Sequence, residues 1–117
     1  MKWTTDLAYV IGLITTDGSL SIDGRHINLT SKDIEQIQTF ARLLNLNNKI
    51  GTKHSSYNPK GIYYQIQFGD VKLYRFLLSI GLSPNKTKTL GGLKIPNKFF
   101  PDFLRGHLDG DGYTYSY

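Results

Sequence analysis

Apolar residues switch between helical and strand spacing along this chain, in an order that repeats. Spacings of three and four residues predict helices over 7–16, 34–44, 70–80 and from 101 onward. Short segments of alternating or strand-favouring residues predict strands over 19–22, 26–30, 49–55 and 62–68. The predicted order is therefore helix, hairpin, helix, hairpin, helix, connection, helix.

Turn and capping residues stand at the ends of these segments. Asp23-Gly24 predicts a tight two-residue hairpin turn. The segment 30–33 resembles a capping box before the second helix, and Asp70 and Gly81 suit the start and stop of the third. Pro101 suits the first turn of the last helix. Capping candidates for the first helix are Thr4, Thr5 and Asp6.

Hairpins that alternate with helices predict an α+β fold, with a four-stranded antiparallel sheet covered by helices on one face. Ile62, Tyr64, Ile66 and Phe68 should share the covered face of the last strand. The open face would present hydrogen-bonding groups and cations with almost no acid, which suits base edges and phosphates, although a solvated face is the plain alternative. Its residues, with Arg25 added from the turn, are Ser19, Ser21, Arg25, His26, Asn28, Thr30, Lys49, Lys53, Ser55, Tyr63, Gln65 and Gln67.

Charge strengthens the nucleic-acid interpretation. The 117 residues are enough for one compact domain, and their net charge of +5 favours an anionic partner, with nucleic acid ahead of an acidic protein or a membrane surface. Solubilising charge is the alternative. The chain has no cysteine, which excludes disulfides and thiolate metal sites. Its longest apolar run is too short to span a bilayer and lacks signal-peptide flanks, so we expect an intracellular protein, cytoplasmic or organellar.

A repeated segment carries the chemistry. Residues 10–18 and 104–112 both contain an apolar helix with an internal glycine, followed by a small residue, an acid and a glycine. Glycine inside a helix costs about 1 kcal/mol relative to alanine, so its recurrence suggests a shared packing need. Small residues four apart allow two helix backbones to approach closely. We expect the two helices to pack together through Gly12, Thr16, Gly106 and Gly110.

That packing would bring Asp17 and Asp111 together at two helix carboxyl ends, where the macrodipole is already negative. A divalent cation would relieve the repulsion, and carboxylates with water and phosphate oxygens suit Mg²⁺. Such a cation can activate water against a phosphodiester. A plain Asp-Gly turn is the alternative, which the duplication disfavours. The basic segment 85–89 is either a solvated linker or the source of a lysine near the phosphate.

The two segments resemble the paired LAGLIDADG motifs of homing endonucleases, specifically two-motif members of the intein or intron type. The first copy departs from the pattern at Thr15 and Thr16, and the second at Arg105, His107 and Gly110. The connection 81–87 is similar to the stretch before the second motif in such members. The resemblance implies double-strand cleavage of a long DNA site, with the sheet in the major groove and the motif helices between two lobes.

The resemblance also assigns roles. The penultimate acid of each motif binds metal, which implies catalytic and metal-binding roles for Asp17 and Asp111 with Mg²⁺ or another divalent cation. Asp109 is the weaker candidate, because Thr15 stands at its position in the first copy. Family members often carry a lysine near each active centre, and Lys86 is the candidate here.

Residues 1–100 should form a complete first lobe, and 101–117 the second motif helix with the start of an incomplete second lobe. We therefore expect double-stranded DNA as partner and no efficient cleavage by the monomer. The chain would be either a truncated fragment of a two-lobe enzyme or a lobe that pairs two chains through Gly12 and Thr16 as a homodimer. Two competing interpretations are a non-catalytic DNA-binding or regulatory relative and an RNA maturase with the same fold.

Overall fold

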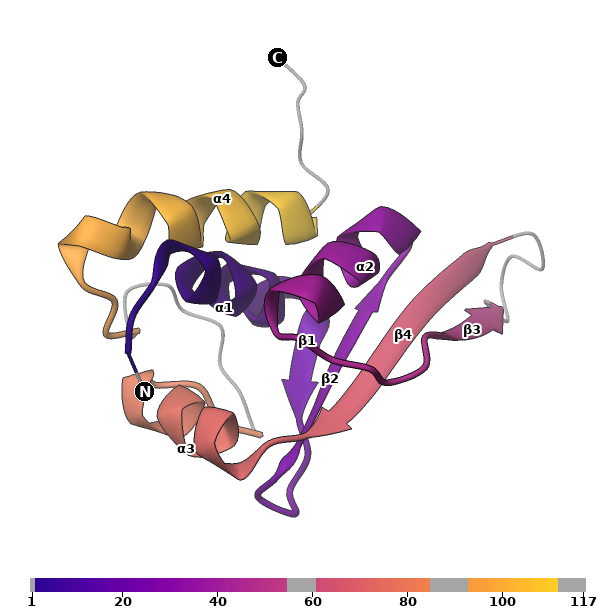
Figure 1. The fold of residues 1–117 in the computed structure, drawn as a ribbon, viewed down its shortest axis with the longest axis horizontal. Coiled ribbons are helices and arrows are strands. Elements are labelled where there is room, and N and C mark those ends of the chain that lie inside the picture. Colours follow the sequence, from indigo (N-terminus) through magenta and orange to yellow (C-terminus); the bar gives the residue numbers. More distant parts are fainter. Residues whose placement is uncertain (1, 55–60, 85–92, 112–117) are drawn as a thin grey trace.

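The computed structural model describes residues 2–54, 61–84 and 93–111, without the side chain of Asp111. The element order is the predicted one (Figure 1). The elements are α1 (Thr5–Asp17), β1 (Gly18–Leu20), β2 (His26–Ser31), α2 (Ile34–Leu43), β3 (Gly51–His54), β4 (Ile62–Gly69), α3 (Val71–Ile80), a short 3₁₀ helix (Asn97–Phe99) and α4 (Phe100–Asp111). Of the predicted residues, Ser55 and Lys86 lie outside the described part.

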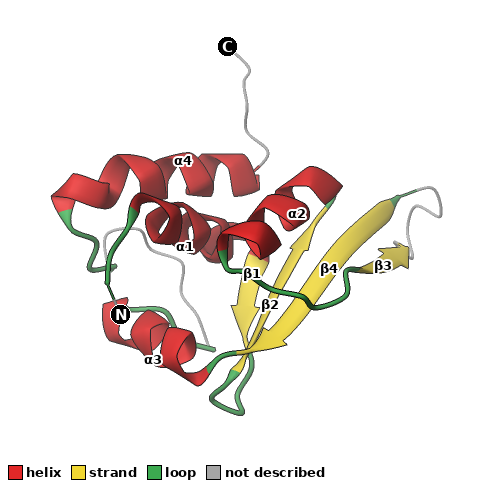
Figure 2. Cartoon of the chain, viewed as in Figure 1, coloured by secondary structure: helices red, strands yellow, loops and turns green. Residues whose placement is uncertain are grey.

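The strands form one antiparallel sheet in the order β1-β2-β4-β3, which confirms the predicted α+β class. Figure 2 shows the helices gathered on one side of the strands, with the other side open. Burial alternates accordingly, because Ile27 and Leu29 of β2 are almost fully buried while their neighbours in the strand are only partly covered. The alternation along the sequence therefore reports a sheet with one covered face.

Helix α1 is the centre of the core. Its residues from Leu7 to Thr15 are all buried, so the helix has no solvent face over most of its length. A helix apolar on every side must be covered on every side, and here the sheet lies against one face and α4 against another. No helix in the described ranges is long and apolar enough to cross a membrane.

Several helix ends are capped as predicted. The Thr4 hydroxyl accepts a hydrogen bond from Leu7 N at 3.0 Å, and the Asp70 carboxylate accepts one from Leu73 N at 3.0 Å. Gly81 ends α3 in the left-handed region, with φ of 118°. These side chains satisfy backbone groups that the first and last helical turns leave unpaired.

The capping box predicted at 30–33 is wrong. Strand β2 runs to Ser31, so Thr30 stays in the sheet opposite Gln65. Asp33 is itself the N-cap of α2 and accepts from Glu35 N at 2.9 Å. The capping box would have required Thr30 at the start of the helix, but pairing in the sheet holds this residue in β2.

The first hairpin turn is wider than predicted. Strand β1 ends at Leu20 and β2 begins at His26, so 21–25 form the connection. The Asp23 carboxylate accepts hydrogen bonds from the backbone N–H groups of Arg25 and His26, which favours a wider turn over a two-residue one. The strand predicted over 49–55 is also shorter, since β3 begins at Gly51.

The covered face of β4 is shorter than its alternation predicts. Ile66 and Phe68 are buried and Tyr64 is partly covered, whereas Ile62 is 42% exposed. The outer end of β4 pairs with β3, whose described residues are all exposed, so no helix covers this corner of the sheet.

Candidate active site

The two repeat helices, α1 and α4, lie in backbone contact. A methyl group placed on Gly12 would come 2.2 Å from the Phe103 carbonyl oxygen, and one on Gly106 would come 2.1 Å from the Tyr9 carbonyl oxygen. Both distances are far inside van der Waals contact, so no side chain fits at either position. The glycines that weaken each helix locally are the residues that let the two helices meet.

Polar contacts also join the two helices. The Tyr9 hydroxyl donates to the Asp109 carboxylate at 2.7 Å. The Thr15 hydroxyl donates to the Gly12 carbonyl at 2.6 Å, and its oxygen lies within hydrogen-bond distance of His107 Nδ1, 2.9 Å away. From the contact of Gly12 with Phe103 and His107 to the contact of Gly110 with Thr16, residue numbers rise together along both helices. The helices are therefore parallel.

Parallel packing brings the carboxyl ends of both helices together. A methyl group on Gly110 would lie 1.9 Å from the Thr16 hydroxyl oxygen and 3.6 Å from an Asp17 carboxylate oxygen. Asp17 is the last residue of α1 and Asp111 the last residue of α4. The second helix also fills the face of α1 that carries Gly12 and Thr16. A homodimer that pairs two chains through these residues would have to displace α4.

An open hollow of 1030 Å³ adjoins these helix ends. Carboxylates from three elements line it, namely Asp17 of α1, Glu35 of α2 and Asp109 of α4, together with Asp33 at the α2 N-cap. Oxygen donors are what Mg²⁺ prefers. Within the described ranges, no three acidic or histidine side chains are close enough together to hold a metal ion by themselves. The donor chemistry fits a cation whose remaining ligands are phosphate and water oxygens.

Asp109 has a structural role in this arrangement. Its carboxylate accepts from Tyr9, and its backbone carbonyl accepts from the Gln36 side-chain amide at 2.7 Å. Gln36 also accepts from the Ser31 hydroxyl at 3.1 Å, so α1, α2 and β2 all connect to the last turn of α4. The sequence contained no signal for these partners, because they are distant along the chain and meet only through packing.

Lys32 is a cation that sequence reasoning missed. It lines the same hollow as Asp17, and its ammonium group lies 5.6 Å from the centre of the Tyr63 ring. A signal was present, since Lys32 follows Asn28 and Thr30 at the two-residue spacing of the open sheet face. Its assignment to a helix cap concealed that signal.

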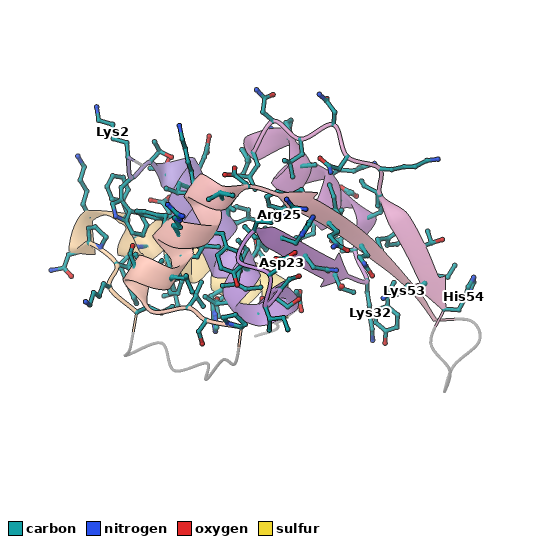
Figure 3. The ribbon with its side chains drawn as sticks, turned by 90° about the horizontal axis from the view of Figure 1, so that it is seen from below. Lys2, Asp23, Arg25, Lys32, Lys53 and His54 are labelled. Carbon is teal, nitrogen blue, oxygen red and sulfur yellow. The ribbon has the colours of Figure 1, made fainter. Side chains whose placement is uncertain are left out.

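The open face of the sheet brings most of the predicted DNA-binding residues into rows. Ser19, Asn28 and Gln67 are paired across β1, β2 and β4, and Tyr63 of β4 pairs with Lys53 of β3. Lys49, Lys53, Gln65 and Gln67 help to line a shallow hollow of 250 Å³. Figure 3 shows Arg25 at one end of this face and Lys32, Lys53 and His54 at the other. His26 lies beside Gly69 on the same face, whereas Ser21 and Arg25 belong to the turn.

The Tyr9–Asp109 contact predicts a late tyrosine ionisation. Burial, followed by the hydrogen bond to Asp109 and its negative charge, raises the pKa of Tyr9 to about 12 from its ordinary value near 10. The neutral phenol is favoured by the fold, so its stabilising contribution is complete below about pH 10 and is lost as pH rises towards 12.

We expect phenolate absorbance to show one of the 8 tyrosines ionising late, and Tyr9→Phe to remove that step. The variant should also lose about 1.5 to 3 kcal/mol of unfolding free energy at neutral pH, the range for a hydrogen bond to a charged group. Tyr63→Phe, which removes a tyrosine from the sheet face, should leave the late step in place. An unchanged titration curve for Tyr9→Phe would contradict the assignment.

Comparison with known families gives a match. Residues 4–81 match the family model described as LAGLIDADG-like domain, a span that includes α1 to α3 and all strands of the sheet. The matched span ends before α4, so the second copy of the repeat rests on its own residues. A comparison with curated proteins finds no match.

Proposed function

Because this chain belongs to the LAGLIDADG family, we propose that it acts as a metal-dependent, site-specific DNA endonuclease of the homing type. The family comprises homing endonucleases and related maturase-type proteins, and its members bind DNA generally as dimers or with two domains. Double-strand cleavage by this chain would accordingly need a second lobe, supplied by another copy or by further sequence, and a monomer alone should not linearise DNA.

The observation that carries the proposal is the parallel α1–α4 pair. Its packing holds Asp17 and the backbone of Asp111 at the same end, beside a hollow lined by carboxylates and Lys32. Thr30 and Tyr63 of the sheet line the same hollow, so the carboxylates adjoin the surface proposed to contact DNA. A phosphodiester lying on the sheet would therefore reach the helix ends.

Different residues of the chain would have different roles in cleavage. A divalent cation would supply Lewis acidity and a water nucleophile of lowered pKa. Asp17 and Asp111 would hold it through carboxylate oxygens, at helix ends whose dipoles add further negative potential. Lys32, held over Tyr63, would offset the negative charge of the incoming phosphate. Lys86 stays our prediction for a second cation near the phosphate.

Among the predicted DNA contacts, Lys53 offers a direct test of the docking surface. It is exposed on β3 and pairs with Tyr63, so its ammonium group would meet the phosphate backbone. We expect Lys53→Ala to weaken binding to all duplex sequences about equally and to lower the slope of log K against log salt by about one.

Measurement of duplex binding at several salt concentrations checks this prediction. Lys2→Ala is the matched control, because Lys2 lies at the end of the molecule far from Lys53 in Figure 3. It should leave the slope unchanged. Equal slopes for wild type and Lys53→Ala would show that the sheet face is not the docking surface. Structured RNA of equal charge should compete less well than duplex DNA if the endonuclease assignment is correct.

A further inference from the structure

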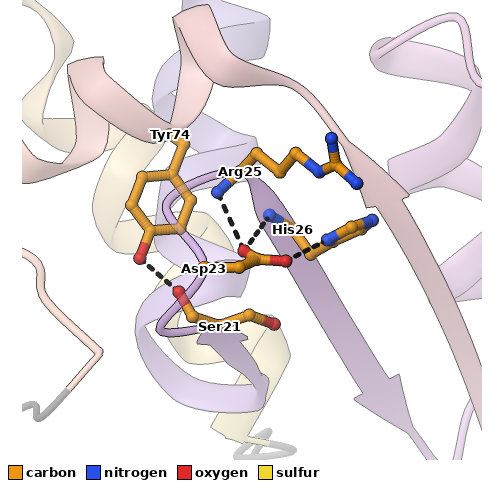
Figure 4. A network of polar contacts seen from close by, with 5 residues as sticks. All are labelled: Ser21, Asp23, Arg25, His26 and Tyr74. Carbon is orange, nitrogen blue, oxygen red and sulfur yellow. Dashed lines mark hydrogen bonds and ion pairs between the residues drawn. The ribbon is translucent and has the colours of Figure 1, made fainter.

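The turn between β1 and β2, residues 21–25, is held from within by one carboxylate. Asp23 accepts hydrogen bonds from Arg25 N at 2.9 Å and from His26 N at 3.0 Å, and its second oxygen contacts His26 Nδ1 (Figure 4). The His26 hydrogen bond, followed by the two backbone N–H groups, holds the pKa of the Asp23 carboxyl well below its usual range. Asp23 therefore stays charged at neutral pH, and the turn keeps these contacts.

The same turn is held from outside by the start of α3. The Tyr74 hydroxyl donates to the Ser21 carbonyl, as Figure 4 shows, and Asp70 N donates to the Arg25 carbonyl at 2.9 Å. Ser21 N also donates to the His26 carbonyl at 3.0 Å, which continues the strand pairing into the turn. Both ends of the connection are thus fixed to the folded body.

The side chain that this fixed backbone presents to solvent is that of Arg25. Within the described ranges, no ion pair uses its guanidinium group, and the residue is exposed. In Figure 4 its side chain extends beside the His26 ring in the direction of β4. Ile22, 90% exposed, stands at the same turn. Several hydrogen bonds fix the backbone of the turn, while the side chains of Ile22 and Arg25 remain available to a partner.

A phosphate contact would not need such a turn, because a mobile loop delivers positive charge equally well. Base recognition does need it. An arginine fork reads guanine O6 and N7 in the major groove only when its backbone is correctly placed, and a backbone fixed in advance loses less entropy on binding. The amount of restraint on residues 21–25 therefore favours a role in reading sequence.

We propose that Arg25 reads a guanine in the DNA site and that Asp23 is the residue that positions it. This inference rests on the proposed function, since it requires that the open sheet face docks on duplex DNA. Asp23 contacts no base in this arrangement and acts only by fixing the backbone of Arg25 and the ring of His26.

Selection of bound duplexes from a randomised library, followed by binding measurements on the selected site, tests the proposal. Arg25→Ala should abolish the preference for guanine at one position, a loss of about tenfold to a hundredfold in discrimination there. Asp23→Ala, which keeps Arg25, should weaken the same preference at the same position without lowering non-specific affinity, because no cation is lost. Tyr74→Phe removes the hydrogen bond from α3 to the Ser21 carbonyl and leaves the turn's own residues unchanged. It should also weaken the preference for guanine.

Lys53→Ala is the matched control, because loss of a phosphate contact lowers affinity for all sequences about equally. A purely structural role for Asp23 would change the thermal midpoint without changing the selected base, and that result would overturn the proposal. Uniform weakening across sequences by Arg25→Ala would overturn it as well. If the wild-type chain binds duplex DNA with no salt dependence, the docking surface itself is wrong, and the proposed function fails separately.

Discussion

Replacing Gly12 with alanine should destabilise the fold by about 1 to 3 kcal/mol, the range expected when a buried site is overpacked. The added methyl group would lie 2.2 Å from the Phe103 carbonyl and 2.6 Å from His107 N, and backbone atoms cannot move aside as a flexible side chain can. Whether the free energy of unfolding falls or rises shows whether α4 is in contact with α1 at Gly12. Alanine is the better helix former by about 1 kcal/mol, so without α4 in contact the same substitution would stabilise α1.

Urea unfolding of wild type and variant measures this difference. Gly51→Ala is the matched control, because the nearest atom to its added methyl group is 3.9 Å away. We expect that control to stay within about 0.5 kcal/mol of wild type, as surface substitutions usually do. An increase in stability for Gly12→Ala would mean that α1 and α4 are not packed as described.

Replacing Asp17 with asparagine should lower metal-dependent DNA cleavage on the order of a thousandfold, which corresponds to several kcal/mol of transition-state stabilisation. The reason is the loss of a carboxylate ligand at the carboxyl end of α1, whereas the amide keeps the size and shape of the side chain. DNA affinity should change little, because the sheet face is untouched. The variant therefore separates cleavage from binding.

The cleavage assay needs an assembly with two lobes, either paired copies or a longer chain that includes this one. Asp6→Asn is the matched control, since it makes the same chemical change in the first turn of the same helix. That control should cleave at the wild-type rate. Equal cleavage by Asp17→Asn and wild type would remove Asp17 from the metal site.

Hydrophobic periodicity was enough to predict the helices, the strands and the covered face of the sheet. The reason is that an element packed against one neighbouring layer buries only the residues on one face. These are every second residue of a strand, as in Ile27 and Leu29 of β2, and every third or fourth residue of a helix. Glycine at equal places in two helices was enough to predict where α1 and α4 meet. In both cases the signal is local in sequence, although its cause is a long-range contact.

Hydrogen bonds between side chains and nearby backbone groups, which compete with strand pairing, were not predictable in the same way. Asp23-Gly24 fits a tight hairpin turn, and only the geometry shows that the Asp23 carboxylate binds two N–H groups and widens the turn. The outer end of β4 likewise keeps its alternation at Ile62, where none of the described helices covers the strand. Such features depend on what lies opposite a residue, which sequence spacing does not contain.

The two acids of the second motif illustrate the same limit. Asp109 and Asp111 are equal in charge and two residues apart, and position in the repeat alone favours Asp111 as a ligand. The structure adds that the Asp109 carboxylate accepts from Tyr9 and its carbonyl from Gln36. Asp109 is therefore engaged in holding the last turn of α4, which supports the assignment of Asp111 to the metal.

We propose that a divalent cation binds where α1 and α4 end together. Manganese bound to the chain on duplex DNA tests it most directly, because this paramagnetic ion broadens the nuclear resonances nearest to it. We predict broadening centred on the backbone amides of Asp17, Gly18 and Gly110, and its loss in Asp17→Asn. Broadening centred elsewhere in the chain, or broadening at these amides that survives Asp17→Asn, would contradict the proposed metal site.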